Sequence, residues 1–158
     1  AILLPGSSGT TTGSNVAASL EPGEPDHVGD LSHSVWWKWT APGPGVVTFD
    51  TLGSNFDTAL AVYTGTAFPL TWVAENEDVS PYIPQSSASF WTTAGTTYYI
   101  AVDGWVNETG SITLHWLHQP APPTDLFAVI RERRPVSLRA WLKEVPGQAG
   151  RYWRFETP

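Results

Sequence analysis

Residues 35–39 read Val-Trp-Trp-Lys-Trp, and this stretch is the clearest structural signal in the chain. Successive side chains of a β-strand point to opposite faces, so Trp37 and Trp39 share one face while Trp36 and Lys38 share the other. Two tryptophans on one face indicate a core, whereas a lysine on the other indicates solvent. The stretch therefore predicts a half-buried strand, with Trp37 and Trp39 in the core and Trp36 exposed.

Similar short apolar runs recur along the chain between clusters of Gly, Pro, Ser, Thr and Asn. No run shows the 3.6-residue period of an amphipathic helix. Short strands at this spacing are typical of a sandwich with buried inner faces and polar outer faces. We therefore predict an all-β, antiparallel β-sandwich with a C-terminal β-hairpin extension, and with sandwich strands at 46–51, 59–63, 70–75, 88–92, 97–103 and 110–116.

The composition excludes several classes of protein. The chain has 158 residues, of which 41% are hydrophobic, and this favours one globular domain over a disordered chain. It contains no cysteine, which excludes disulfide bonds and thiolate metal sites. No apolar run is long enough to span a bilayer. Because residue 1 is alanine and no methionine occurs, we expect a trimmed start or excision from a longer precursor.

The last forty residues differ in character from the rest. Residues 119–124 (QPAPPT) read as a stiff, extended connector. Beyond them, residues 136–145 alternate, 146–150 (PGQAG) form a turn, and 151–157 run back. We predict a sandwich at 1–118, a Pro-rich connector at 119–125 and a basic β-strand and hairpin extension at 126–158.

The net charge of −7 is divided unevenly along the chain. Residues 1–130 carry one lysine against twelve acids, a net of −11, while residues 131–158 carry seven basic residues against three acids, a net of +4. The acidic body excludes nucleic acid as a partner. A basic segment suggests an acidic partner, such as the body of a neighbouring copy. The candidate assembly residues are Arg131, Arg133, Arg134, Arg139, Trp141, Lys143, Arg151, Trp153 and Arg154.

Four blocks in order resemble the bacterial pre-peptidase C-terminal (PPC-like) domain. They are residues 20–27 (LEPGEPDH), 34–42 (SVWWKWTAP), 54–65 (SNFDTALAVYTG) and 94–104 (AGTTYYIAVDG). The resemblance covers about residues 1–117 and none of the tail. It implies a jelly-roll-like β-sandwich that serves as a non-catalytic accessory unit on secreted bacterial enzymes and cell-surface proteins. An extracellular or cell-surface location follows from the resemblance.

The acidic turn before the tryptophan-rich strand is the candidate metal site. Glu21, Glu24 and Asp26 offer the oxygen ligands that Ca²⁺ prefers. Collagen-binding relatives of the PPC-like family use an acidic segment here for calcium, but they carry aspartate where this chain has Ser32 and Ser34. The alternative is a solvated acidic turn. Ca²⁺ is the one candidate cofactor.

Nine tryptophans are many for this length, and exposed ones can stack on sugar rings. Trp36, Trp72 and Trp105 are the candidate ligand-binding residues. The sequence leaves Trp72, Trp91 and Trp105 undecided between core and surface. The alternative is that these rings fill a wide sandwich core.

No catalytic constellation is visible. Neither a Gly-x-Ser-x-Gly elbow nor an oriented base accompanies the serines around His33. His115 and His118 lack a cysteine or acidic partner nearby, and we interpret them as a surface pair. Asp57 is expected to bond to backbone N–H groups of a turn. We expect no enzyme.

Two functions remain open. The first is a structural, self-assembling extracellular subunit of an oligomer or filament, which docks its basic C-terminal strands on the acidic body of the next copy by strand exchange. The alternative is an accessory domain of a secreted hydrolase that binds polysaccharide or protein fibres, with calcium as a possible requirement. Neither function involves a membrane span.

Overall fold

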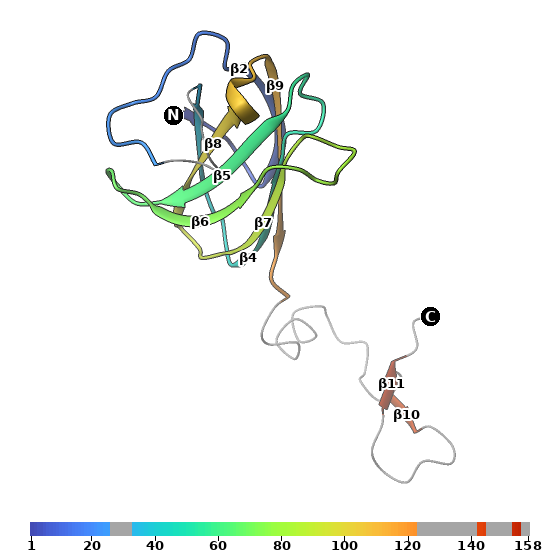
Figure 1. The fold of residues 1–158 in the computed structure, drawn as a ribbon. Helices are drawn as coiled ribbons and strands as arrows, with labels where there is room; N and C mark the ends of the chain where they lie inside the picture. The colour runs from blue at the N-terminus through green and yellow to red at the C-terminus, as the bar shows by residue number, and fades with distance from the viewer. Residues whose placement is uncertain (26–32, 123–141, 145–152, 156–158) are drawn as a thin grey trace. The chain divides into compact units, whose positions relative to one another are not determined.

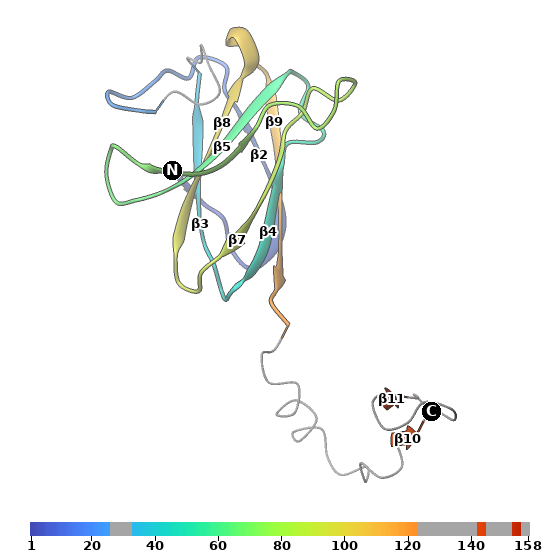
Figure 2. The same cartoon turned by 60° about the horizontal axis from the view of Figure 1, so that its bottom comes forward.

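The computed structural model describes residues 1–25, 33–122, 142–144 and 153–155. Contacts divide the chain into two units, Ala1–Ala121 and Pro122–Pro158, and each is described by itself. The first unit consists of two β-sheets packed face to face (Figure 1), and Figure 2 shows the same strands after a rotation of 60°. The predicted all-β sandwich is therefore confirmed. Within the described residues, no helix has the length and apolar character needed to cross a membrane.

The first sheet contains five strands in the order β1-β3-β8-β5-β6. These are β1 (Ile2–Leu3), β3 (Val35–Thr40), β8 (Thr97–Gly104), β5 (Thr58–Thr64) and β6 (Thr71–Asn76). All neighbours are antiparallel except β1, which runs parallel to β3. As predicted, Trp37 and Trp39 point inward and are fully buried. Trp36 lies on the outer face of the sheet, as expected from the alternation, but it is half-buried rather than exposed.

The second sheet contains four antiparallel strands in the order β2-β9-β4-β7. These are β2 (Ser8–Ser14), β9 (Ser111–Pro120), β4 (Gly45–Asp50) and β7 (Ser87–Thr92). A short 3₁₀ turn, η1 (Trp105–Asn107), lies between β8 and β9. The sequence did not predict β2, because its residues SGTTTGS have no apolar face.

Strand β9 corrects the interpretation of the two histidines. The strand continues to Pro120, four residues past the predicted end, and its alternation holds as far as His118. Ile112, Leu114 and Trp116 therefore point inward, and so does His118, which is only 5% exposed. His118 lies 5.6 Å from the Trp39 ring, measured between centroids. The predicted surface pair is thus wrong, since His118 is a core residue.

The two sheets meet around the tryptophans that the sequence placed in the core. Trp39 packs edge-on against Phe49, with centroids 5.8 Å apart, and its Nε1 donates to the carbonyl oxygen of Gly6 at 2.8 Å. On β2, a Cβ built at Gly13 would lie 2.9 Å from Cζ2 of Trp37. The small residues of β2 therefore make room for an indole that reaches across from the other sheet.

The second unit contains an antiparallel pair of strands, β10 (Leu142–Glu144) and β11 (Trp153–Phe155). The register places Lys143 opposite Arg154 and Glu144 opposite Trp153. The predicted C-terminal hairpin is therefore present. The rest of the predicted extension at 126–158 lies outside the described residues.

Candidate functional site

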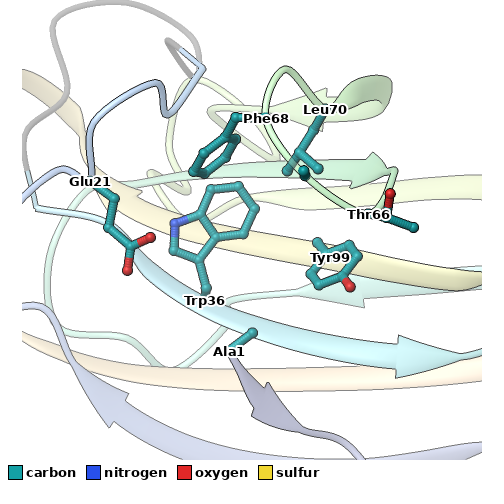
Figure 3. A pocket seen from close by; sticks show the side chains of 8 residues that line it. Ala1, Glu21, Trp36, Thr66, Phe68, Leu70 and Tyr99 are labelled. Atoms are coloured by element: carbon teal, nitrogen blue, oxygen red, sulfur yellow. The ribbon is translucent and has the colours of Figure 1, made fainter.

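A pocket opens on the outer face of the five-stranded sheet, between β3, β8 and the loop that joins β5 to β6 (Figure 3). Its volume is about 230 Å³, which suits one sugar ring or one side chain rather than a larger ligand. Its lining is mostly carbon, with one carboxylate at the side. The lining residues are Ala1, Glu21, Trp36, Thr66, Ala67, Phe68, Leu70 and Tyr99.

Trp36 is the central side chain of this pocket, and its orientation is set by Glu24. The indole Nε1 donates to Oε1 of Glu24 at 2.6 Å and lies 3.1 Å from Oγ of Ser34. The Ser34 hydroxyl also donates to the same carboxylate oxygen. The other oxygen, Oε2, accepts the backbone N–H of Glu21 at 2.7 Å. One carboxylate thus joins the acidic turn to the indole, which leaves the ring little freedom to rotate.

Aromatic and aliphatic groups hold the Trp36 ring from below and from the side. The ring lies 5.8 Å from Tyr63 and 6.4 Å from Phe68, the latter edge-on. Tyr63 is only 3% exposed and packs with Ala61 and Ala101, and Trp36 and Leu70 cover this small cluster. The pocket wall is therefore built on a satellite core, separate from the cluster between the sheets.

The carboxylate of Glu21 is the only acidic group among the described lining residues, and Figure 3 shows it beside the Trp36 indole. Thr66 contributes a hydroxyl from the β5–β6 loop. The combination of a planar ring, an acceptor carboxylate and a hydroxyl can bind a sugar, whose C–H face is apolar and whose hydroxyls need partners.

The three candidate tryptophans do not form one site. Trp36 lines the pocket. Trp72 lies on β6 and is 57% exposed, and its Nε1 donates to Oε2 of Glu75 at 3.0 Å. Trp105 lies in η1 and is half-buried. Of the three, only Trp36 contributes to the pocket.

The structure describes only two of the three candidate calcium ligands. Glu21 and Glu24 are described, while Asp26 lies outside. In the described part of the chain, no group of three or more His, Cys, Asp or Glu side chains is placed to hold a metal ion. Both oxygens of Glu24 accept hydrogen bonds from the protein. The role that the structure shows for Glu24 is therefore to position Trp36.

The assembly residues can be located only in part. Lys143 lies on β10, and Trp153 and Arg154 lie on β11. The other six, Arg131, Arg133, Arg134, Arg139, Trp141 and Arg151, lie outside the described residues.

An acidic group that sequence reasoning did not assemble surrounds Asp57. Burial raises the pKa of the Asp57 carboxyl, and the carboxylates of Asp78, Glu108 and Glu77 raise it further. The backbone N–H of Asp57 donates to Oε2 of Glu108 at 2.9 Å. Oδ1 of Asp57 is buried and has no hydrogen-bond partner among the described residues, so this oxygen does not serve the turn as expected. Glu77 and Asp78 are neighbours in the sequence, but Asp57 and Glu108 come from two other segments, so no sequence pattern signals the group.

No protein-family model and no curated protein matches the chain. Among solved structures, it is similar to PliG of Aeromonas hydrophila, a periplasmic inhibitor of g-type lysozyme. The identity is 15%, the match covers 75% of this chain and 95% of PliG, and the TM-score is 0.51. The likeness is one of fold. A second similar structure is the pre-peptidase C-terminal domain of the Bacillus anthracis collagenase, at 14% identity, with 73% of this chain and 92% of that domain covered and a TM-score of 0.49. This second structure carries the name of the family that the four sequence blocks resemble.

Proposed function

We propose that the sandwich is a non-catalytic, extracellular binding module that takes one sugar ring of a polysaccharide in the Trp36 pocket. The observation that carries the proposal is the fixed indole: Glu24 holds Trp36 at the wall of a pocket that has the volume of a single ring. A ring that is already oriented loses little side-chain entropy when a ligand stacks on it.

The groups around the indole match the remaining chemistry of a sugar. The C–H face of the sugar would lie on Trp36, and its hydroxyls would donate to the Glu21 carboxylate and bond with Thr66. Hydrolysis of a glycosidic bond ordinarily uses two carboxyl groups on either side of it. Among the described lining residues, Glu21 is the only one with a carboxyl group, which supports binding without catalysis.

An extracellular location is consistent with the fold. The similar PliG structure is a periplasmic protein, and the four sequence blocks resemble a domain of secreted and surface proteins. The absence of cysteine fits any compartment, since the sandwich is stabilised by its tryptophan-rich core.

The test is a titration of the full chain with soluble oligosaccharides of cellulose, chitin, xylan and mannan, followed by calorimetry and tryptophan fluorescence. We expect at least one series to bind, and we expect Trp36→Ala to abolish that binding while Trp72→Ala leaves it unchanged. Because Trp36 also covers the satellite cluster, the exposed Glu21→Gln provides a second variant that keeps the fold and weakens binding. The proposal is contradicted if no oligosaccharide series binds. It is also contradicted if Trp36→Ala and Glu21→Gln both bind as tightly as the unmodified chain. If the chain binds no oligosaccharide but is retained on collagen, protein fibres are the ligand instead.

Calcium dependence remains a proposal that rests on Glu21, Glu24 and Asp26. Its test is the same titration with added Ca²⁺ and with a chelator. If the acidic turn holds calcium, the chelator lowers the affinity, the melting temperature or both. If neither the affinity nor the melting temperature changes, the turn does not depend on calcium, and its role is to position Trp36 through Glu24.

Self-assembly is the second candidate, and the observation that favours it is the division of charge between residues 1–130 and 131–158. Attraction between a net of −11 and a net of +4 on neighbouring copies is screened by salt. Light scattering of the full chain should therefore show association that weakens between 50 and 500 mM NaCl. Replacing Arg131, Arg133 and Arg134 by serine should abolish it. A monomer at every concentration and salt contradicts this function.

A further inference from the structure

The outer face of the four-stranded sheet is rich in hydroxyl groups, and it is part of neither the pocket nor the charged tail. Alternation along β2, β9, β4 and β7 assigns to this face the residues that do not enter the core. Most of them are serine or threonine. Asp50 is the single Asp, Glu, Lys or Arg among these outward positions, although residues 1–130 carry a net charge of −11. We call this surface the hydroxyl face.

The hydroxyls of this face are ordered by contacts between neighbouring strands. Thr48 on β4 and Ser89 on β7 pair across the sheet, and their hydroxyl oxygens lie 2.7 Å apart. Thr10 on β2 lies opposite His115 on β9, with Oγ1 2.8 Å from Nδ1. The Nε2 of His115 lies 3.0 Å from the carbonyl oxygen of Leu52, which can only accept, so Nε2 is the donor of this contact.

An exposed indole stands at the edge of the hydroxyl face. Trp91 is on β7, the edge strand of the sheet, and is 66% exposed. Val46 lies directly across from it on β4. Leu117 on β9 pairs with Thr48 and is 51% exposed. The face thus places a planar apolar ring and two aliphatic groups beside rows of oriented hydroxyls.

We propose that the hydroxyl face, with Trp91 as its anchor, binds the flat surface of a neutral polysaccharide. Sugar rings offer an apolar C–H face to Trp91 and hydroxyls that both donate and accept, as the Ser and Thr side chains do. A face nearly free of ionised groups loses little charge hydration when covered. The acidic body repels anionic polysaccharides, which leaves a neutral chain as the matching partner.

This surface goes beyond the proposed pocket, because a sheet face can contact an insoluble polymer that a pocket of about 230 Å³ cannot admit. The hydroxyl face and the Trp36 pocket lie on the outer faces of opposite sheets. Each can therefore bind or fail independently, and variants separate the two.

The test measures depletion of the full 158-residue chain from solution by microcrystalline cellulose and by β-chitin, at 150 and 500 mM NaCl. We expect retention on at least one solid that salt does not abolish, and a loss of about tenfold or more in partition coefficient for Trp91→Ala. Trp72→Ala is the matched control, since it removes another exposed indole from the other sheet and should leave retention unchanged. Ser89→Ala should weaken retention less than Trp91→Ala does.

Several outcomes overturn the proposal. These are no retention of the unmodified chain on either solid, equal retention of Trp91→Ala, or an equal loss with Trp72→Ala. A dimer that Trp91→Ala converts to monomer, with retention unchanged, would show that the face contacts a second copy instead. Retention that survives Trp36→Ala and Glu21→Gln supports the hydroxyl face even if no soluble oligosaccharide binds, so its result is separable from that of the pocket.

Discussion

The indole Nε1 of Trp36 donates to Oε1 of Glu24 at 2.6 Å, and this bond links the acidic turn before β3 to the aromatic outer face of the sheet. Sequence reasoning treated the two residues separately, one as a calcium ligand and the other as a sugar platform. In the structure they belong to one site, in which the carboxylate orients the ring.

Removal of this carboxylate should destabilise the fold and loosen the ring. Glu24→Ala leaves the indole N–H without its charged acceptor, and hydrogen bonds to charged groups contribute about 1.5–3 kcal/mol. We expect a loss of about that size in the free energy of unfolding, measured by urea denaturation, together with a shift in tryptophan emission.

Glu75→Ala is the matched control for Glu24, because Glu75 accepts from an indole N–H as well, that of Trp72. Trp72 is 57% exposed, so water can replace the lost acceptor, and we expect a change within about 0.5 kcal/mol. Equal losses for the two variants would show that Glu24 has no special positioning role.

The acid group around Asp57 should make the sandwich less stable as pH rises. Burial, followed by the carboxylates of Asp78, Glu108 and Glu77, raises the pKa of Asp57 above its ordinary value of 3.8. Between 3.8 and the raised pKa, the folded state holds a proton that the unfolded state has lost. The contribution of Asp57 to stability is therefore fully present below pH 3.8 and declines as pH rises through that window.

Asp57→Asn removes this penalty. We expect the variant to melt at a higher temperature than the unmodified chain at pH 7, and we expect the difference to vanish near pH 3. Melting followed by circular dichroism across this range is the measurement. Asp50 is half-buried and is not among the groups that raise the pKa of Asp57, so Asp50→Asn serves as the control for loss of one charge. A difference that is independent of pH would contradict the electrostatic cause.

The contact between Gly13 and Trp37 should not tolerate even a methyl group. A Cβ at position 13 would lie 2.9 Å from Cζ2 of Trp37, whose side chain is fully buried between the sheets. We expect Gly13→Ala to lower the free energy of unfolding by about 1–3 kcal/mol, as overpacking does in other cores. Gly43→Ala adds the same methyl where nothing lies within 4 Å, and it should be neutral or slightly stabilising.

The same contact shows why sequence reasoning found β3 but missed β2. The alternation of Trp37 and Lys38 is visible within one strand, because both faces carry strongly different side chains. The residues of β2 have no apolar face to reveal, since their inner positions are small in order to admit indoles from elsewhere. When the residues of a strand are chosen to fit side chains of other strands, its own sequence shows little of the apolar alternation that predicts a strand.

The candidate site was predictable to a similar extent. Trp36 could be assigned to an outer face because one strand contains the needed pattern. Its bond to Glu24 joins residues that are twelve positions apart in the sequence. The acids near Asp57 come from two further segments, one with Glu77 and Asp78 and one with Glu108. His118 was misjudged because a polar residue entered the core at the end of a strand that was expected to stop earlier.

Asn15 provides the last prediction, since its buried amide ties the end of β2 to the residues before β9. The side chain is fully buried; Nδ2 donates to the carbonyl oxygen of Glu108 at 3.1 Å, and Oδ1 accepts the N–H of Gly110 at 2.7 Å. Asn15→Ala leaves both backbone groups without a partner, and each such loss costs about 1–3 kcal/mol. We expect a decrease of at least about 2 kcal/mol in the free energy of unfolding.

Asn15→Asp separates the role of the amide donor from that of side-chain shape. At pH 7 the aspartate is ionised in a buried position and faces the Glu108 carbonyl without a hydrogen to donate, so we expect a larger loss than for Asn15→Ala. Burial raises the pKa of such a group, so as pH falls the protonated carboxyl regains a donor and the difference from the unmodified chain shrinks. Asn15→Ala has no group to titrate, and its deficit should stay constant over the same range. Urea denaturation of the three chains at pH 7 and pH 4 measures both effects, and a constant deficit for Asn15→Asp would contradict the donor role of Nδ2.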